Sequence, residues 1–571
     1  MTALLPDDAT AGAVHLDTAR PGGPVVRASG IRVFRRDGAH TDLVRGIDLE
    51  VWPGHTLGIV GESGSGKTIT ASAIADLLPG ALDFGLDSFE LAGRSVPDLS
   101  ARERRAWIRR HIGVVFQNPV AALNPRLTIG AQVHEALPRE LRGRRERWAR
   151  VVELLDQVGI PAAAERLHAY PHELSGGLNQ RVVIAIAIAR NPVLLIADEP
   201  TTALDVSVQA RVLDLIDGLK RDLGIGVLLV SHDIGVIAER ADAILVMRSG
   251  RAVEQGPAAQ LLDHPVQAYT RDLIAAAPDV RAPALRADRD DSEIVLEARE
   301  LRRDFPLPRG LGRRRYRRAL DGVSLTIRDG DSIGLVGESG SGKTTFARAL
   351  VGLDTGSTGE VRYGGSPVHE LSGGRRREWR RNVQYIFQDP YGAIDPRLTV
   401  RAAIAEPIEI SGTPVERAQI DERVTALMRE VELDPALADR RPGTLSGGQR
   451  QRVVIARALA LDPRVLVADE PVSALDLTVQ AAVIDLLRRL QRSRGLSLVL
   501  ISHDLAVVKS LCARIVVLRN GVVVEQGDAE EVFDAPAHEY TRELLAAIPT
   551  RAATVPSTDN TPNPSAEEHT R

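Results

Sequence analysis

The chain contains little cysteine, little lysine and few aromatic residues, and the shortage of cysteine excludes several kinds of site. With one cysteine, Cys512, it cannot form an internal disulfide, a zinc knuckle or an iron–sulfur cluster. That composition is typical of a protein from a reducing compartment. Cys512 stands in the apolar run Ser510-Leu511-Cys512-Ala513, so we expect it to be a small residue of the core.

Long apolar runs and an excess of positive charge are also absent. No stretch approaches the ~18 consecutive apolar residues that indicate a membrane-spanning helix. The first 23 residues show no basic segment followed by an apolar core, so we expect no secretory signal. The net charge of −4 argues against a dedicated nucleic-acid binder, which is usually basic. We therefore expect no nucleic-acid partner, and any membrane role must come through partner proteins.

Two of the four lysines in the chain occupy the same octapeptide. Gly-Glu-Ser-Gly-Ser-Gly-Lys-Thr stands at 61–68 and again at 337–344. It fits a phosphate-binding loop, in which glycines turn backbone N–H groups toward phosphate, the lysine reaches the β- and γ-phosphates and the threonine holds Mg²⁺. Arginine is a poor substitute for that compact charge. The predicted nucleotide-binding residues are Gly61, Glu62, Ser63, Gly64, Ser65, Gly66, Lys67 and Thr68, with Gly337, Glu338, Ser339, Gly340, Ser341, Gly342, Lys343 and Thr344.

Internal repetition sets the domain organisation. From Gln117 to Tyr269, a stretch of 153 residues, motifs recur 271 positions later without insertion. The phosphate loops are 276 positions apart, so the first copy carries five extra residues between its loop and Gln117. The chain therefore consists of two similar halves. In the first half, the motifs that recur are Phe116-Gln117-Asn118-Pro119, Leu174-Ser175-Gly176-Gly177, Asp198-Glu199-Pro200, Ser231-His232-Asp233, Glu254-Gln255-Gly256 and Tyr269-Thr270.

Each half has the pattern of an α/β fold, and we predict two tandem P-loop NTPase domains. Apolar runs lead into both phosphate loops, and helices are predicted to follow at Gly66 and Gly342. Continuous apolar runs are typical of parallel strands buried on both faces. The 109 to 114 positions between each loop and its Leu-Ser-Gly-Gly leave room for a helical insert. Strands are predicted at 57–60, 193–197, 227–230 and 333–336, with hairpins at Asn520-Gly521 and, more weakly, Ser249-Gly250.

Composition marks the domain boundaries. The stretch between the halves is rich in Ala, Arg, Asp and Pro without an apolar period, which is typical of a linker. The end of the chain is rich in Pro, Ser, Thr and Asn, which predicts disorder. We expect a disordered segment at 1–26, a first domain with a C-terminal extension at 27–278, a linker at 279–293, a second such domain at 294–549 and a disordered tail at 550–571.

The motifs, taken in order, resemble the nucleotide-binding domain of ABC transporters. Phosphate loop, glutamine loop, Leu-Ser-Gly-Gly, apolar strand with Asp-Glu-Pro, Ala-Leu-Asp and Ser-His-Asp occur in each half, and the resemblance covers about 500 of 571 residues. It implies a RecA-like core with a helical subdomain in each half, ATP hydrolysis, and ATP and Mg²⁺ as cofactors. Asp198 and Asp469 close apolar strands, and with the loop threonines they offer the oxygen ligands that Mg²⁺ prefers.

The resemblance also assigns roles to other residues. A glutamate after each strand polarises the attacking water, a histidine contacts the γ-phosphate, and a glutamine joins the metal site. The Leu-Ser-Gly-Gly segment serves the ATP of the other domain, so the loop at 61–68 pairs with Ser446 and the loop at 337–344 with Ser175. Both partners lie on one chain, and we expect two hydrolytic sites. The residues are Glu199, His232, Glu470 and His503 for catalysis; Thr68, Gln117, Asp198, Thr344, Gln388 and Asp469 for the metal; and Gln117, Ser175, Gly176, Gly177, Gln388, Ser446, Gly447 and Gly448 for the nucleotide.

Three details depart from a simple repeat. A second Leu-Ser-Gly-Gly at 371–374 precedes Gln388, the wrong position for this motif, so we interpret it as a decoy. The first motif continues with Leu178 where the second has Gln449, which affects transmission rather than the phosphate contacts. Phe34 and Phe305, each after a first strand, are candidates for stacking on adenine, with edge-strand packing as the alternative and Tyr316 competing with Phe305.

Among transporter classes, the chain resembles the ATPase subunits of dipeptide, oligopeptide and nickel importers. The resemblance rests on Phe-Gln-Asn/Asp-Pro and on the segments 264–271 and 537–542, which look like the C-terminal extension of those subunits. It implies two transmembrane permease subunits, an extracytoplasmic solute-binding protein and a peripheral location at the cytoplasmic face of the inner membrane. Peptide, glutathione-like and nickel cargoes stay open.

Other tandem ATPases are alternatives. A soluble ATPase acting on ribosomes usually has a long charged linker, whereas about 15 residues separate the halves here, and DNA-repair relatives need zinc cysteines or coiled-coil inserts. An exporter motor usually carries a membrane domain on the same chain. A fused sugar importer typically has one degenerate half, whereas both halves here are complete.

Overall fold

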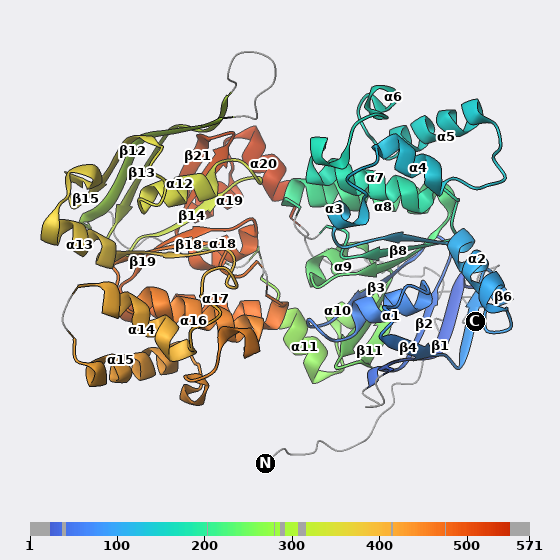
Figure 1. Ribbon diagram of the computed structural model, residues 1–571, viewed down its shortest axis with the longest axis horizontal. Coiled ribbons are helices and arrows are strands. Elements are labelled where there is room, and N and C mark those ends of the chain that lie inside the picture. The colour runs from blue at the N-terminus through green and yellow to red at the C-terminus, as the bar shows by residue number, and fades with distance from the viewer. Residues whose placement is uncertain are drawn as a thin grey trace, which may run out of the picture.

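A computed structural model of the chain describes residues 23–36, 42–201, 204–278, 280–281, 283–285, 292–306, 316–412, 415–473 and 475–548. Most of the predicted disordered ends, 1–22 and 549–571, and much of the predicted linker lie outside the described residues. The first strand begins at Val26, one residue before the predicted start of the first domain. The two halves lie side by side with their helical inserts at opposite ends of the molecule (Figure 1). The halves therefore face each other head to tail.

A six-stranded sheet carries the phosphate loop of the first half. Its order is β11-β10-β3-β9-β8-β7, with parallel pairing except at the edge strand β11. Strand β3 lies in the interior of this sheet, so the loop that follows it opens at the carboxyl edge, where α/β folds bind ligands. The predicted strands are confirmed here. The bounds are β3 Thr56–Val60, β7 Ile112–Val115, β8 Leu194–Asp198, β9 Gly226–Val230, β10 Ala243–Arg248 and β11 Arg251–Pro257.

The second half repeats this sheet in the order β17-β18-β19-β14-β20-β21. Both predicted hairpins are confirmed: Asn520 and Gly521 have φ of 50° and 80°, and Ser249 and Gly250 have 48° and 79°. Positive φ at both central residues matches the twist of the flanking strands. The bounds are β14 Ser332–Val336, β17 Val383–Ile386, β18 Val465–Asp469, β19 Ser497–Ile501, β20 Arg514–Arg519 and β21 Val522–Asp528.

A smaller antiparallel sheet packs beside each phosphate-loop helix. In the first half its order is β2-β1-β5-β6 with β4 on β1, and in the second it is β13-β12-β15-β16. Apolar cores join these sheets to the six-stranded sheets and to the loop helices. The bounds are β1 Val26–Arg35, β2 Asp42–Val51, β4 Leu82–Gly85, β5 Ser88–Leu91, β6 Arg94–Ser95, β12 Ile294–Pro306, β13 Tyr316–Arg328, β15 Thr358–Tyr363 and β16 Ser366–Pro367.

In the first half, the helical insert predicted between the phosphate loop and the first Leu-Ser-Gly-Gly is present as α3 to α6, which follow Gln117. The predicted helix after each phosphate loop is also present. The bounds are α1 Lys67–Ile74, α2 Ala101–His111, α3 Pro119–Ala122, α4 Ile129–Ala136, α5 Arg144–Gln157, α6 Ala163–Arg166, α7 Gly176–Ile188, α8 Val206–Leu223, α9 Ile234–Arg240, α10 Ala258–Asp263 and α11 Ala268–Ala275.

The second half has α14 and α15 as its helical insert. Cys512, at the end of α18, is fully buried, as predicted, and burial raises the pKa of its thiol. No helix in the described ranges is both long and apolar enough to cross a membrane. The bounds are α12 Lys343–Leu350, α13 Gly373–Asn382, α14 Val400–Ile410, α15 Arg417–Glu430, α16 Gly447–Leu459, α17 Leu477–Arg494, α18 Leu505–Leu511, α19 Ala529–Asp534 and α20 Glu539–Ala546.

Candidate functional site

Glycine is required at the start of each phosphate loop. Gly61 and Gly337 have φ of 150° and 146°, and a Cβ at either would lie about 2 Å from a backbone carbonyl oxygen, that of Met247 or Leu518. No other residue fits that approach. Within the loops, the buried hydroxyls of Ser65 and Ser341 have no hydrogen-bond partner among the residues that the structure describes. Each loop therefore offers a tightly turned backbone with polar groups still to be satisfied.

The loop lysines are almost buried and lie across their own loops. Lys67 Nζ donates to the carbonyl oxygens of Gly61 at 2.7 Å and Glu62 at 2.9 Å. Lys343 makes the corresponding two bonds at the same distances. Burial lowers the pKa of both lysines, and nearby carboxylates act in the opposite direction. The ammonium groups thus stand at the carboxyl edge of the sheet, where an anion would be bound.

The loop threonines meet the aspartates that end β8 and β18. Thr68 Oγ1 donates to Asp198 Oδ1 at 3.0 Å, and Thr344 Oγ1 to Asp469 Oδ1 at 3.1 Å. Burial raises the pKa of both aspartates. No cluster of three or more His, Cys, Asp or Glu with metal-binding geometry occurs among the described residues. Each site therefore offers two hard oxygen donors, which fits a cation that keeps several waters, such as Mg²⁺.

The glutamate after each aspartate is held in an unusual backbone conformation. Glu199 and Glu470 have φ of 45° and 48°, a region that glutamate rarely adopts. Strain of this kind persists where the surroundings fix it, and it is frequent at active sites. Both copies carry it, which points to a functional position.

Two neighbours orient each of these carboxylates. Gln117 Nε2 donates to one oxygen of Glu199 at 2.7 Å, and His232 Nδ1 lies 3.2 Å from the other. In the second half the matching distances are 2.8 Å for Gln388 and 3.4 Å for His503. The hydrogen bond to the glutamate raises the pKa of each histidine. Burial acts to raise the pKa of Glu470, but His503 and Lys343 outweigh it and the pKa is lowered.

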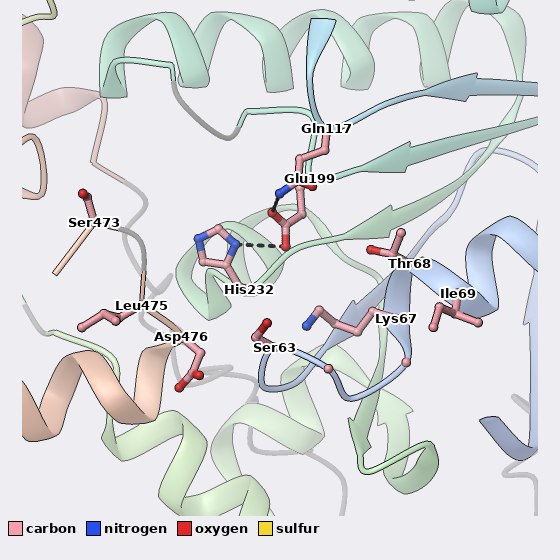
Figure 2. A pocket seen from close by; sticks show the side chains of 12 residues that line it. Ser63, Lys67, Thr68, Ile69, Gln117, Glu199, His232, Ser473, Leu475 and Asp476 are labelled. Atoms are coloured by element: carbon pink, nitrogen blue, oxygen red, sulfur yellow. Dashed lines mark hydrogen bonds and ion pairs between the residues drawn. The ribbon is translucent and has the colours of Figure 1, made fainter. Parts of the chain in front are cut away.

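These groups line two cavities, and each cavity is shared by the two halves. The first, of about 420 Å³, is lined by Lys67, Gln117, Glu199 and His232 from one half (Figure 2). Its opposite wall is Ser473, Leu475 and Asp476, which come from the other half. The second cavity, of about 470 Å³, is lined by the matching residues Ser339, Gly340, Gly342, Lys343, Thr344, Gln388, Glu470 and His503, together with Leu204 and Asp205 from the first half.

Comparison with family models decides what this arrangement is. A model described as "ABC transporter" matches residues 44–202 and 320–473, more than half of the chain. The chain belongs to the ABC transporter family. A second model, "Oligopeptide/dipeptide transporter, C-terminal region", matches 253–301 and 524–569. Like other ATP-binding subunits of ABC transporters, the chain is an ATPase that binds ATP, and its two halves are ABC ATPase domains.

Curated relatives cover nearly the full length of this ABC ATPase. The peptidoglycan transport ATP-binding protein YejF of Agrobacterium fabrum is 44% identical over 519 residues, 90% of this chain and 94% of the relative. The glutathione import ATP-binding protein GsiA of Escherichia coli K12 is 43% identical over 551 residues, 90% and 88% respectively. A chain from the solved complex of archaeal ribosomal stalk protein aP1 and ribosome recycling factor aABCE1 has a TM-score of 0.54 and 22% identity, covering 85% of this chain and 87% of that one. At that identity the likeness concerns the fold alone.

The Leu-Ser-Gly-Gly segments of this ABC ATPase lie next to the shared cavities without lining them. Ser175 and Ser446 cap the N-termini of α7 and α16, as predicted for helix starts. A Cβ at Gly447 would lie 3.5 Å from Leu475, a residue that lines the first cavity. In this structure the Leu-Asp pairs of the opposite half, Leu475-Asp476 and Leu204-Asp205, belong to the cavity walls. The described lining does not include Ser175, Gly176, Gly177, Ser446, Gly447 and Gly448.

Sequence reasoning missed the residues of that wall. The Ala-Leu-Asp repeat at 203–205 and 474–476 was visible, but nothing in it indicates which phosphate loop it faces. The extra Leu-Ser-Gly-Gly at 371–374 forms the start of α13, with Ser372 as its N-cap, as Ser100 is the N-cap of α2 in the first half. This segment is not in the lining of either cavity.

The two candidates for adenine stacking differ in position. Phe305 lines the second cavity beside Arg317, and the Arg303 guanidinium lies 4.5 Å from the centre of its ring. Phe34 pairs with β2 and β4 on strand β1 and does not line the first cavity, and Tyr316 lines neither. The structure therefore brings Phe305, but not Phe34, to the site. The sequence analysis did not single out Arg317, because this arginine lies outside every nucleotide-binding motif.

Proposed function

We propose that the chain is the ATP-hydrolysing subunit of an importer that takes up peptides or related small solutes through separate permease subunits. The observation that carries this proposal is the match of both C-terminal extensions to the oligopeptide/dipeptide transporter region. The relatives named for peptidoglycan transport and glutathione import support the same solute class, because both cargoes contain peptide bonds.

ATP binding uses the phosphate loops. The N–H groups of each loop and the N-terminus of the following helix face the phosphates, and Lys67 or Lys343 moves from its loop carbonyls to the phosphate oxygens. Both cavities lie in the range of about 300–1,000 Å³ typical of small-ligand sites. Phe305 and Arg317 form one wall of the second cavity, where a purine ring could stack.

The metal site of each half consists of a threonine, an aspartate and a nearby glutamine. Thr68, Asp198 and Gln117 fit Mg²⁺ in the first half, and Thr344, Asp469 and Gln388 fit it in the second, because all offer oxygen ligands. Bound Mg²⁺ would neutralise charge on the β- and γ-phosphates. Gln117 and Gln388 also lead into the helical inserts, so their contacts depend on the state of the nucleotide.

Hydrolysis requires a base beside the γ-phosphate. Glu199 and Glu470 accept a proton from a water molecule as its oxygen attacks phosphorus and ADP leaves. The strained backbone and the bonds from Gln117 and His232 hold the Glu199 carboxylate in one orientation. His232 and His503, which lie beside these glutamates, would contact the γ-phosphate and respond to its loss.

Transport follows from closing and opening of the two halves. Each cavity has a wall from the opposite half, so ATP bound to one half also contacts the other. Binding would bring Ser446 to the loop at 61–68 and Ser175 to the loop at 337–344, and product release would reopen the halves. We place the chain at the cytoplasmic face of the inner membrane, bound to two permease subunits, with an extracytoplasmic solute-binding protein delivering the cargo.

Co-purification from membranes of the native host tests this function. The tagged chain is isolated as wild type and as the double variant Glu199→Gln with Glu470→Gln, which we expect to bind ATP and hardly turn over. Mass spectrometry should find two multi-span permeases, enriched with the double variant in ATP. Ribosomal proteins or nucleic acid in place of permeases would contradict the importer role, and wild-type turnover in the double variant would remove both glutamates from the mechanism.

A further inference from the structure

The C-terminal extension of each half reaches the phosphate loop of the same half. Tyr269 on α11 is buried, and the backbone N–H of Glu62 donates to its Oη at 3.3 Å. Tyr540 on α20 takes the same place, accepting from the N–H of Glu338 at 2.9 Å. In each half the tyrosine and the glutamate that it contacts are more than 200 residues apart in sequence. Because both halves make this contact, we infer that it contributes to the structure of the site.

The extension is held firmly enough to position these tyrosines. Glu254 on β11 accepts hydrogen bonds from the N–H groups of Val266 and Gln267 at 2.8 and 3.1 Å, at the start of α11. Glu525 binds the N–H groups of Ala537 and His538 before α20 in the same way, at 2.7 and 3.1 Å. A carboxylate at a helix N-terminus is favoured by the helix dipole. The repeated Glu-Gln-Gly motif thus supplies the anchor of each tyrosine helix.

An arginine packs against the ring of each tyrosine. The guanidinium groups of Arg248 and Arg519 lie 4.6 Å from the ring centres of Tyr269 and Tyr540. Burial raises the pKa of both phenols, that of Tyr540 to about 12, so the hydroxyl proton is kept. Each tyrosine therefore presents a neutral hydroxyl to the loop from a ring that is packed in place.

The same loop residue is also gripped by the opposite half. Thr478 on α17 donates to the Glu62 carboxylate at 3.2 Å, and Ser207 on α8 bonds Glu338. These helices lie against the extensions, α17 on α11 and α8 on α20, along the line where the halves meet (Figure 1). Leu477, next to Thr478, packs into the core of the first half. The second residue of each phosphate loop is thus held by its own extension through the backbone and by the other half through the side chain.

We propose that Tyr269 and Tyr540 are positioning residues of the two phosphate loops, so that each C-terminal extension is a working part of its ATP site. Through Glu62 and Glu338 the extension links the shape of the loop to contact with the opposite half. This assigns a role to the repeated Tyr-Thr motif that the transport function leaves unexplained.

Conservative substitution in the full-length chain tests the proposal. Tyr269→Phe and Tyr540→Phe keep the ring and its arginine contact and remove only the acceptor oxygen. We expect the double variant to raise the KM for ATP and the Kd of a fluorescent ATP analogue by about threefold to tenfold, the size of one hydrogen bond. The kcat at saturating ATP should change less than twofold, because the glutamates are untouched.

Tyr363→Phe is the matched control. Tyr363 is buried and accepts a hydrogen bond from Asn382 Nδ2 at 2.7 Å, but it lines neither cavity. Tyr363→Phe should lower the melting temperature as much as Tyr269→Phe or Tyr540→Phe does, while leaving the ATP affinity unchanged. An ATP affinity in the Tyr269→Phe, Tyr540→Phe variant equal to that of wild type overturns the proposal.

A double-mutant cycle tests the link to the opposite half. Tyr269→Phe and Thr478→Val act on the same residue, Glu62, so their effects on ATP affinity should be less than multiplicative. Tyr540→Phe with Thr478→Val, which act on different loops, gives the background coupling. Equal coupling in the two pairs overturns the link through Glu62.

Discussion

The two ATP sites of this chain have nearly the same contacts within the phosphate loop but different surroundings of the aspartate. At the second site, Asp469 accepts hydrogen bonds from Thr344 and, at 2.6 Å, from the Tyr385 hydroxyl. At the first site β7 has Val114 in the place of Tyr385, so this strand offers Asp198 no phenol, and within the described ranges its side-chain donor is Thr68. Repetition of motifs therefore does not make the two sites chemically equal, because a residue between motifs changes the hydrogen bonds of the aspartate that we propose as a metal ligand.

A second difference lies in the Leu-Ser-Gly-Gly helices. Ser446 and Gln449 form a complete capping box at α16, with bonds of 3.2 and 3.1 Å. At α7, the Leu178 side chain cannot accept a hydrogen bond from the Ser175 N–H. Only the other bond of the capping box is present, from the Leu178 N–H to Ser175 Oγ at 3.4 Å. With the pairing proposed above, Ser175 serves the second site. Both departures therefore affect the second site, and we expect the first to hydrolyse ATP faster.

The largest effect should come from removing one base at a time. We expect Glu199→Gln to reduce steady-state phosphate release more than Glu470→Gln. Glu199 belongs to the first site, which is paired with α16, the helix that has the complete capping box. The double variant should lose at least about 100-fold, the contribution typical of a general base. Phosphate release at saturating ATP measures all three. Equal losses in the two single variants would contradict the difference between the sites.

Substitution of Tyr385 removes the difference between the two aspartates that we propose as metal ligands. Its hydroxyl occupies Asp469 Oδ2, so Tyr385→Phe frees a lone pair for the metal. We expect Mg²⁺ to half-saturate ATP retention at about threefold lower concentration, the size of one modest hydrogen bond. Titration of bound ATP against Mg²⁺ in the Glu199→Gln, Glu470→Gln background gives the value.

The reciprocal variant, Val114→Tyr, serves as the matched comparison. Its hydroxyl would meet Asp198, so the first site should need more Mg²⁺. Unchanged Mg²⁺ dependence in both variants would show that the phenol does not compete with the metal.

The sequence predicted the parts of the fold that depend on local pattern. The strands, the Asn520-Gly521 hairpin and the helix starts at Ser175 and Ser446 follow from neighbours in sequence. Packing at the carboxyl edge of a parallel sheet then brings the loop threonine to the aspartate. These features need no knowledge of how the halves meet.

What the sequence could not predict depends on distant contacts. Asp476 lies about 400 positions from Lys67, and no periodicity indicates that they share a cavity. Tyr385 reads as an ordinary strand residue until its partner on β18 is known. Phe34 and Phe305 occupy similar sequence positions, yet only Phe305 lines a cavity. The local repeat gives the components of each site but not its walls.

The capping difference predicts a smaller effect. Leu178→Gln restores the side chain that returns a bond to the Ser175 N–H, and a completed N-cap stabilises a helix by about 0.5–2 kcal/mol. We expect a slightly higher melting temperature and an ATP affinity within about twofold of wild type, because the Ser175-Gly176-Gly177 backbone is unchanged. Gln449→Leu should lower the melting temperature slightly. Differential scanning calorimetry and ATP titration measure both, and a loss of stability in Leu178→Gln would contradict the capping argument.

The smallest expected effect concerns the histidine–glutamate pair, in which the sites are alike. The folded-state pKa of His503 is raised by Glu470, so its stabilisation is complete below the ordinary pKa of 6.5 and disappears as the pH rises through the raised value. The pKa of Glu470 is lowered, so its share is present above 4.5 and disappears as the pH falls. The melting temperature of wild type minus that of His503→Gln should therefore be largest between about pH 4.5 and 6.5 and decline toward pH 9. The shift should be small because the histidine is 41% exposed. The pKa of His232 is raised by the matching contact with Glu199, so His232→Gln should give a parallel curve. A melting-temperature difference between wild type and either variant that grows with pH would contradict the ion pair.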